Sequence, residues 1–150
     1  MVKKEFMYCN VEVSSEEELF SLFYDDLFSN GYVKESWLAA VSDREKVFPT
    51  GLALENYNVA IPHSDVDHVN ESTIAVATLS KPLVFCLMED PDVKVDVSLV
   101  ISLIVADPKQ QVEFLRSVIG AIQDEQFVQN MLRASSSDEM LNLLKEKIEI

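Results

Sequence analysis

The sequence predicts an α/β sandwich, with helices packed on both faces of a β-sheet. Helical periodicity marks both ends of the chain, whereas residues 52–105 consist of short runs rich in β-branched and apolar residues. The last run, residues 95–105, is apolar on both faces, which is typical of a central strand covered by helices. Because 150 residues with 48% apolar composition match one complete core, we expect a single domain over residues 1–150.

Two helices are expected before the strands. Ser14 and Ser15 precede Glu17 and Glu18 at the spacing of a capping box, and apolar residues then recur with helical period until Asn-Gly at residues 30–31 ends the helix. A second helix is expected over residues 34–46. The Pro-Thr-Gly sequence at residues 49–51 separates it from the strand region.

The strand region leads directly into a third helix. The expected strands are residues 59–61, 73–79, 83–85 and 95–105. Asp107 and Pro108 follow the last strand as the N-cap and first-turn proline of a helix with one apolar face. Shorter helices are expected at residues 126–132 and 139–147, which gives a helix pair, a sheet and then further helices.

Charge and hydropathy exclude several classes of function. The net charge of −14, from 26 acidic and 12 basic residues, argues against binding to nucleic acid or to an anionic membrane surface. No apolar stretch approaches the roughly 20 residues that a membrane helix needs, and no signal peptide is recognisable. The two cysteines, Cys9 and Cys86, lie far apart, as is usual for thiols in a reducing compartment. We therefore expect a cytoplasmic protein without membrane insertion.

His63 is the most informative residue of the chain. It follows an apolar strand-like run, Val59–Ile61, and a proline that ends the run and fixes the backbone. A histidine held at the end of a strand can titrate near neutral pH or act as a nitrogen nucleophile. The alternative is a partly exposed loop histidine without a chemical role.

Other reaction types are poorly supported. The chain lacks the glycine-rich loops that bind nucleotides and the usual zinc and serine-hydrolase motifs, so we expect no cofactor. His63 and His68 do not converge on one ion in either an extended or a helical conformation, so we expect no metal site. Cys86 is followed in the sequence by several carboxylates, which disfavour a thiolate, so we expect it to be a poor nucleophile.

A phosphoryl-accepting histidine remains as a chemical possibility. This role requires one free ring nitrogen, a second ring nitrogen that keeps its proton, and a few donors for the phosphoryl oxygens. Arg44, late in the second helix, and Gln111, early in the helix after the long strand, are candidate donors. The alternative for both is a solvated helix residue.

Four segments are informative when taken together: Arg-Glu-Lys-Val-Phe-Pro-Thr-Gly at 44–51, Asn-Val-Ala-Ile-Pro-His at 58–63, the strand at 97–105 and Asp-Pro-Lys-Gln-Gln at 107–111. Through them the sequence resembles a known family, the mannitol/fructose-type enzyme IIA domains of the bacterial phosphoenolpyruvate-dependent sugar phosphotransferase system (PTS). Within this family it resembles the galactitol-specific branch, through Phe-Pro-Thr-Gly, the position of His68 five residues after His63 and the start of the third helix.

The resemblance implies a fold, a function and a set of site residues. The fold is a sandwich with a mixed, mostly parallel central sheet. The function is that of a cytoplasmic phosphocarrier, which takes a phosphoryl group from phospho-HPr onto His63. It passes this group to a cysteine of its cognate IIB protein, and the membrane IIC permease then takes up and phosphorylates a sugar or polyol such as galactitol.

The resemblance also assigns the other site residues. Arg44 matches the site arginine of the family. Gln111 lies where mannitol-type members carry a second histidine, and its neutral amide donates a hydrogen bond without carrying charge. His68 is either an auxiliary residue that compensates for this difference or a surface residue.

Two alternatives stay open. A regulatory IIA-like domain keeps the phosphorylated histidine but controls a partner protein instead of feeding a permease. A non-catalytic interaction domain contains the histidine only incidentally, and it predicts no acid-labile phosphorylation.

Overall fold

The computed structural model describes residues 2–148. Two 3₁₀ turns occur in this part of the chain, η1 (Lys4–Phe6) and η2 (Val66–His68). The other elements are β1 (Met7–Val11), α1 (Glu16–Ser29), α2 (Trp37–Val47), β2 (Gly51–Ala53), β3 (Asn58–Ala60), β4 (Thr73–Cys86), β5 (Lys94–Ile104), α3 (Pro108–Ile122), α4 (Glu125–Arg133) and α5 (Ser137–Lys147).

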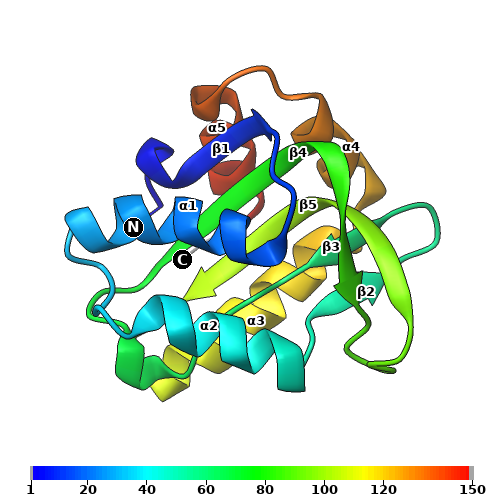
Figure 1. Cartoon of the computed structure of the whole chain (residues 1–150). Helices are drawn as coiled ribbons and strands as arrows, with labels where there is room; N and C mark the ends of the chain where they lie inside the picture. The colour runs from blue at the N-terminus through cyan, green and yellow to red at the C-terminus, as the bar shows by residue number, and fades with distance from the viewer. Residues whose placement is uncertain (1, 149–150) are drawn as a thin grey trace.

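The five strands form one mixed sheet in the order β1-β4-β5-β3-β2 (Figure 1). The β1/β4 and β3/β5 pairs are parallel, whereas the β4/β5 and β2/β3 pairs are antiparallel. The mixed sheet is therefore confirmed, but only two of its four pairings are parallel, so "mostly parallel" was wrong. The connection between β4 and β5 is too short for a crossover, which makes this long central pair a hairpin.

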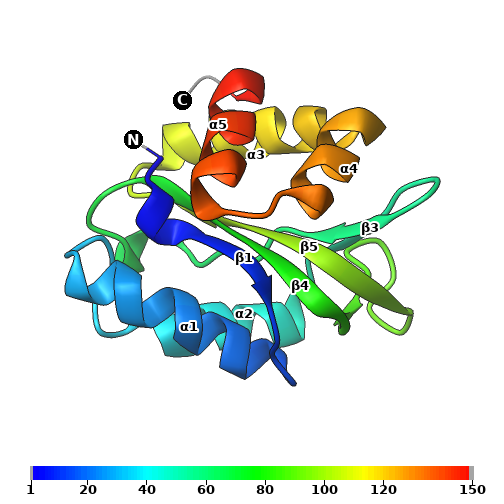
Figure 2. The same ribbon diagram turned by 90° about the horizontal axis from the view of Figure 1, so that it is seen from above.

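Helices cover both faces of the sheet, as predicted. Figure 2 shows α1 and α2 on one face and α3, α4 and α5 on the other. The side chains of β5 alternate between the two cores: Val100 and Ile104 pack on the α1/α2 side, and Leu99, Ile101 and Leu103 pack with the other helices. This alternation explains the unbroken apolar pattern of residues 95–105.

The predicted caps of α1 and α3 are confirmed, whereas α2 begins three residues later than the expected residue 34. Ser15 caps α1 by accepting a hydrogen bond from the backbone N–H of Glu18, and Gly31 ends this helix with a φ of +77°. Asp107 caps α3 through the backbone N–H of Lys109. These caps could be predicted from the sequence because an N-cap side chain bonds a backbone N–H only two or three residues later in the chain.

The strand boundaries differ from the sequence analysis at three places. The two runs predicted at residues 73–79 and 83–85 form one strand, β4, with a register shift between Thr78 and Leu83 that accommodates Pro82. The strands β1 and β2 were missed. Both lie at the edges of the sheet, where a partly exposed strand lacks a continuous apolar pattern, and β2 has only three residues.

No helix within residues 2–148 is long and apolar enough to cross a membrane.

Candidate functional site

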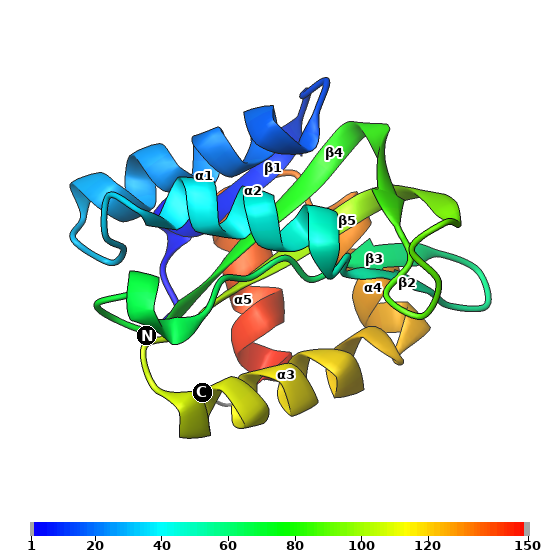
Figure 3. The same cartoon turned by 60° about the horizontal axis from the view of Figure 1, so that its bottom comes forward.

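His63 lies just beyond β3, where the chain continues along β5. The carbonyl of Pro62 accepts hydrogen bonds from the Leu103 backbone N–H at 3.1 Å and from the Ser102 hydroxyl at 2.9 Å. His63 itself forms a parallel bridge with Leu103. Figure 3 shows this segment passing between α2 and α3. The backbone at His63 is therefore fixed by the central strand of the sheet, which confirms the rigid placement expected after Pro62.

One ring nitrogen of His63 is held by the backbone. Nδ1 lies 2.8 Å from the carbonyl oxygen of Ile61, two residues earlier. Because a carbonyl only accepts hydrogen bonds, Nδ1 carries the proton and Nε2 keeps its lone pair. The ring thus has the protonation pattern that phosphoryl acceptance requires.

The other ring nitrogen, Nε2, is free to react. No residue among 2–148 hydrogen-bonds it, although His63 as a whole is only 7% exposed. Among residues 2–148, the enclosed side-chain polar atoms without a hydrogen-bond partner are Trp37 Nε1, Arg44 Nε and Gln111 Oε1, and His63 Nε2 does not belong to this set. Nε2 therefore retains some exposed area on a residue that is otherwise buried.

The surroundings favour the neutral form of His63. Burial lowers the pKa of the imidazole, and the positive charge of Arg44 lowers it further. The hydrogen bond to Ile61 and the carboxylate of Asp65 act in the opposite direction without cancelling the effect of burial. A neutral imidazole is the nucleophilic form, so the site favours attack by Nε2.

Arg44, in the last turn of α2, supplies the positive charge of the site. Its Nη1 lies 3.4 Å from Oδ1 of Asp65, and its guanidinium lies over the ring of Phe48, 5.4 Å from the ring centroid. Arg44, Asp65 and His68 line a common groove of about 330 Å³. Arg44 is therefore partly buried and oriented by Asp65 and Phe48, and its role in the chemistry stays a prediction.

His68 and Gln111 are less closely connected to His63. Nδ1 of His68, in η2, is hydrogen-bonded to the hydroxyl of Ser36 at 2.8 Å. Gln111 lies in the first turns of α3, and its Oε1 is buried without a partner. Within residues 2–148, no hydrogen bond joins either side chain to His63.

Glu45, next to Arg44, is a site residue that the sequence analysis missed. Only 5% of it is exposed, and its carboxylate accepts hydrogen bonds at 2.8 Å from both the backbone N–H and the hydroxyl of Thr50. Burial raises the pKa of Glu45 to about 7, although the two Thr50 donors and Arg44 favour the charged form and Glu16 opposes it. A glutamate in the last turns of a helix gives no sign in the sequence that it turns inward.

The raised pKa of Glu45 makes a prediction about stability. Because the folded state binds the proton more tightly than the unfolded state, Glu45 stabilises the fold fully below about pH 4.5, and this contribution is lost as the pH rises to about 7. A shift of this size corresponds to about 3 kcal/mol. We expect E45Q to remove this contribution, so that the free energy of unfolding falls less between pH 4.5 and 7.5 than in the wild type.

Urea unfolding at several pH values measures this difference. Burial raises the pKa of Glu16 to about 6 and lowers the pKa of His63, but both residues are present in both proteins, so their contributions largely cancel in the comparison. Parallel pH profiles for the two proteins would contradict the assignment.

No group of three histidine, cysteine, aspartate or glutamate side chains in the described part of the chain is arranged to hold a metal ion.

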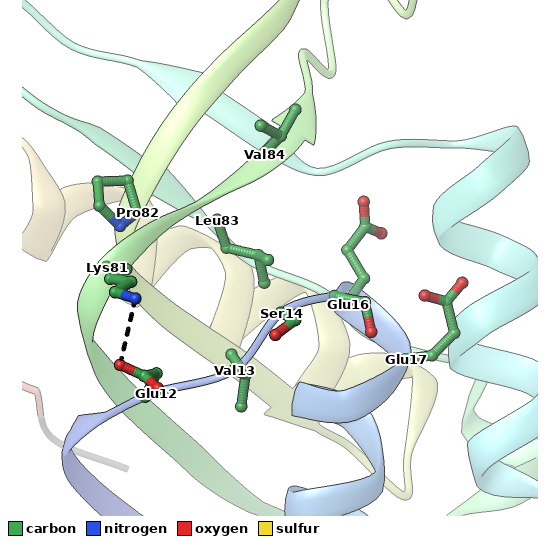
Figure 4. Close-up of a pocket in the computed structure, with 10 residues that line it drawn as sticks. Glu12, Val13, Ser14, Glu16, Glu17, Lys81, Pro82, Leu83 and Val84 are labelled. Atoms are coloured by element: carbon green, nitrogen blue, oxygen red, sulfur yellow. Dashed lines mark ion pairs between the residues drawn. The ribbon is translucent and has the colours of Figure 1, made fainter.

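A second hollow, of about 490 Å³, lies between the start of α1 and β4 (Figure 4). Its charged residues include Glu12, Glu16 and Glu17, and Lys81 forms an ion pair with Glu12 at 3.6 Å. It is larger than the groove at Arg44, but it contains no histidine and none of the candidate residues. The candidate site is therefore at His63, where the candidate residues lie, although the hollow between α1 and β4 is larger.

Nearly the whole chain matches one protein family. Residues 1–147 match the family model described as phosphoenolpyruvate-dependent sugar phosphotransferase system, EIIA 2. The chain belongs to this family. It is thus a phosphotransferase component, and its role is that of a phosphocarrier in the sugar phosphotransferase system. The resemblance stated from the sequence is confirmed.

The individual proteins that the chain resembles share a third of its sequence or less. The galactitol-specific EIIA component of Escherichia coli strain K12 is 32% identical over 127 residues, which cover 85% of this chain and 84% of that protein. The mannitol enzyme IIA from E. coli, solved in complex with phosphorylated enzyme IIB, is 24% identical with a TM-score of 0.79, over 97% of this chain and 99% of that one. The nitrogen regulatory protein IIA-Ntr from Neisseria meningitidis is also 24% identical, with a TM-score of 0.73 and 95% of each chain covered. The two structures confirm the fold.

Proposed function

We propose that His63 is the phosphorylated residue of this phosphocarrier, that phospho-HPr is the donor, and that a cysteine of a cognate IIB protein is the acceptor. The observation that carries the proposal is the hydrogen bond from Nδ1 to the Ile61 carbonyl, which leaves Nε2 as the nucleophile of a neutral ring. The family membership supports it, because a phosphocarrier needs such an acceptor.

The phosphoryl group is transferred twice, and in each transfer one bond to phosphorus forms as another breaks. The Nε2 lone pair attacks the phosphorus of phospho-HPr in line, and the N–P bond in the donor breaks as the new N–P bond forms. In the second step the thiolate of IIB attacks the same phosphorus, the N–P bond to His63 breaks, and an S–P bond forms. His63 keeps its proton on Nδ1 throughout and returns to its starting state, and neither step requires a metal or a nucleotide.

Arg44 stabilises the charge of the phosphoryl group in both steps. Such transfers depend mainly on positioning and on stabilising the charge that spreads over the equatorial oxygens. Arg44 lies close enough to lower the pKa of His63, and its guanidinium presents a planar set of donors. We assign the amide of Gln111 as a second donor, and His68 as an auxiliary group at the edge of the same groove.

Partner choice follows from charge and from the relatives. The net charge of −14 steers a protein with a basic docking face, which is the role we assign to HPr. The E. coli relative is named galactitol-specific, so we propose a galactitol-type IIB acceptor and, through it, a membrane IIC permease. The complex of mannitol enzyme IIA with phosphorylated IIB supports a direct contact of the same kind. The carrier itself acts in the cytoplasm as a single domain.

Phosphoryl transfer to purified IIB proteins tests the acceptor. The protein, labelled by phosphoenolpyruvate, enzyme I and HPr, is mixed with galactitol-type and mannitol-type IIB proteins. We expect the galactitol-type IIB to be labelled at least tenfold faster, with the label on cysteine. Equal rates would contradict the galactitol assignment, and no transfer to either protein would favour the regulatory role suggested by the fold of IIA-Ntr.

A further inference from the structure

A chain of buried hydrogen bonds connects Glu45 to the ring of His63. The carboxylate of Glu45 accepts from the backbone N–H and the hydroxyl of Thr50, both at 2.8 Å. The carbonyl of Thr50 accepts from the backbone N–H of Ile61 at 3.2 Å, and the carbonyl of Ile61 accepts from Nδ1 of His63 at 2.8 Å. Each residue in this series therefore orients the next.

All members of the series are enclosed. Glu45, Thr50, Ile61 and His63 are each buried, so water does not compete for their polar groups. Burying a carboxylate is costly unless its partners are fixed, and Thr50 is the partner that supplies its hydrogen bonds. Because the hydrogen bonds from Thr50 offset the free-energy cost of burying Glu45, the position of Thr50 is tied to that of Glu45 and does not depend on packing alone.

The turn that contains Thr50 is fixed from its other side as well. The Met88 backbone N–H donates to the carbonyl of Gly51 at 2.8 Å, and a Cβ at Gly51 would lie 2.5 Å from the carbonyl oxygen of Cys86. Only glycine fits this approach. The turn is thus held between the β4/β5 hairpin and Glu45, and its Gly51 pairs with Ala60, the neighbour of Ile61, in the β2/β3 ladder.

We propose that Glu45 is a positioning residue for His63. Through Thr50 and Ile61 it places the carbonyl that holds Nδ1–H, and so it sets the tautomer and the orientation in which Nε2 faces an incoming phosphoryl group. The inference rests on the proposed function for its effect on transfer, whereas its effect on the ring is independent of that function.

The test separates ring positioning from plain stability. The variants E45L and T50V remove hydrogen bonds of the series, whereas E45Q and T50S retain them, because a glutamine accepts from the Thr50 N–H and donates to its hydroxyl oxygen. V128A, a truncation of a buried side chain on α4, serves as a control for lost stability alone. Nitrogen-15 NMR of the imidazole reports the tautomer of His63, and rapid mixing with phospho-HPr reports the transfer rate.

We expect E45L and T50V to mix the two tautomers of His63 and to slow transfer at least tenfold. E45Q and T50S should restore a single Nδ1–H tautomer and most of the rate, and V128A should leave the tautomer unchanged. If E45L does not fold, T50V and T50S make the same comparison, because T50V removes only the hydroxyl hydrogen bond to Glu45 and T50S keeps it. An unchanged tautomer in a folded T50V or E45L protein would overturn the proposal, even if the wild type proved not to be phosphorylated.

Discussion

The variant H63A is expected to take up no phosphoryl group from phospho-HPr. The substitution removes the nucleophilic Nε2. The other histidine, His68, bonds through Nδ1 to the Ser36 hydroxyl, which can donate or accept and therefore does not fix the tautomer as the Ile61 carbonyl does for His63. Loss of a nucleophile lowers such rates by at least about a thousandfold. Intact-mass spectrometry at pH 8, after incubation with phosphoenolpyruvate, enzyme I and HPr, should show one added phosphoryl group on the wild type and none on H63A.

Two controls make this result specific. H68A keeps His63 and should retain a single added phosphoryl group, which brief treatment with acid removes. H63Q lacks the nucleophilic ring nitrogen but keeps a side-chain N–H that can donate to the Ile61 carbonyl. In H63A that buried carbonyl loses its partner, which costs about 1–3 kcal/mol of stability. Comparing the two variants therefore separates the loss of the nucleophile from the loss of stability. Label on H63A at a rate near that of the wild type would contradict the assignment of His63, and label that disappears only in H68A would move the acceptor to His68.

Much of the fold was predictable because its signals are local. The caps at Ser15 and Asp107 and the apolar pattern of β5 depend on residues a few positions apart, and the structure confirms each of them. The edge strands β1 and β2 were not predictable in the same way. They are defined by pairing with β4 and β3, which lie later in the chain, and their own residues carry a weak pattern.

In the candidate site, too, the features set by neighbouring residues could be predicted and those set by distant segments could not. The rigid placement of His63 after Pro62 followed from the sequence, because proline acts on its immediate neighbours. The partner of Nδ1 is also local, but a backbone carbonyl has no sequence signature. Glu45 was missed because its role depends on a turn that packs against the distant β4/β5 hairpin. The part of Gln111 in the chemistry stays a prediction.

The second large effect is expected at Arg44. Replacing it with alanine removes the positive charge that we propose stabilises the phosphoryl oxygens, and it leaves Asp65 without its ion-pair partner. Loss of one such stabilising group costs about a hundredfold in rate, or about 3 kcal/mol. R44K keeps the charge but loses the planar set of donors, so we expect an intermediate rate. Rapid-mixing assays of transfer from phospho-HPr measure all three proteins.

The pKa of His63 provides an independent measure of the same charge. Because Arg44 lowers this pKa and Asp65 raises it, R44A should shift the NMR titration of His63 upward, and D65N should shift it downward. The exposed Arg44–Asp65 pair itself contributes little to stability, so both variants should unfold at urea concentrations close to that of the wild type. A normal transfer rate in R44A, combined with the expected upward shift, would mean that Arg44 acts on the imidazole but does not stabilise the transferred group.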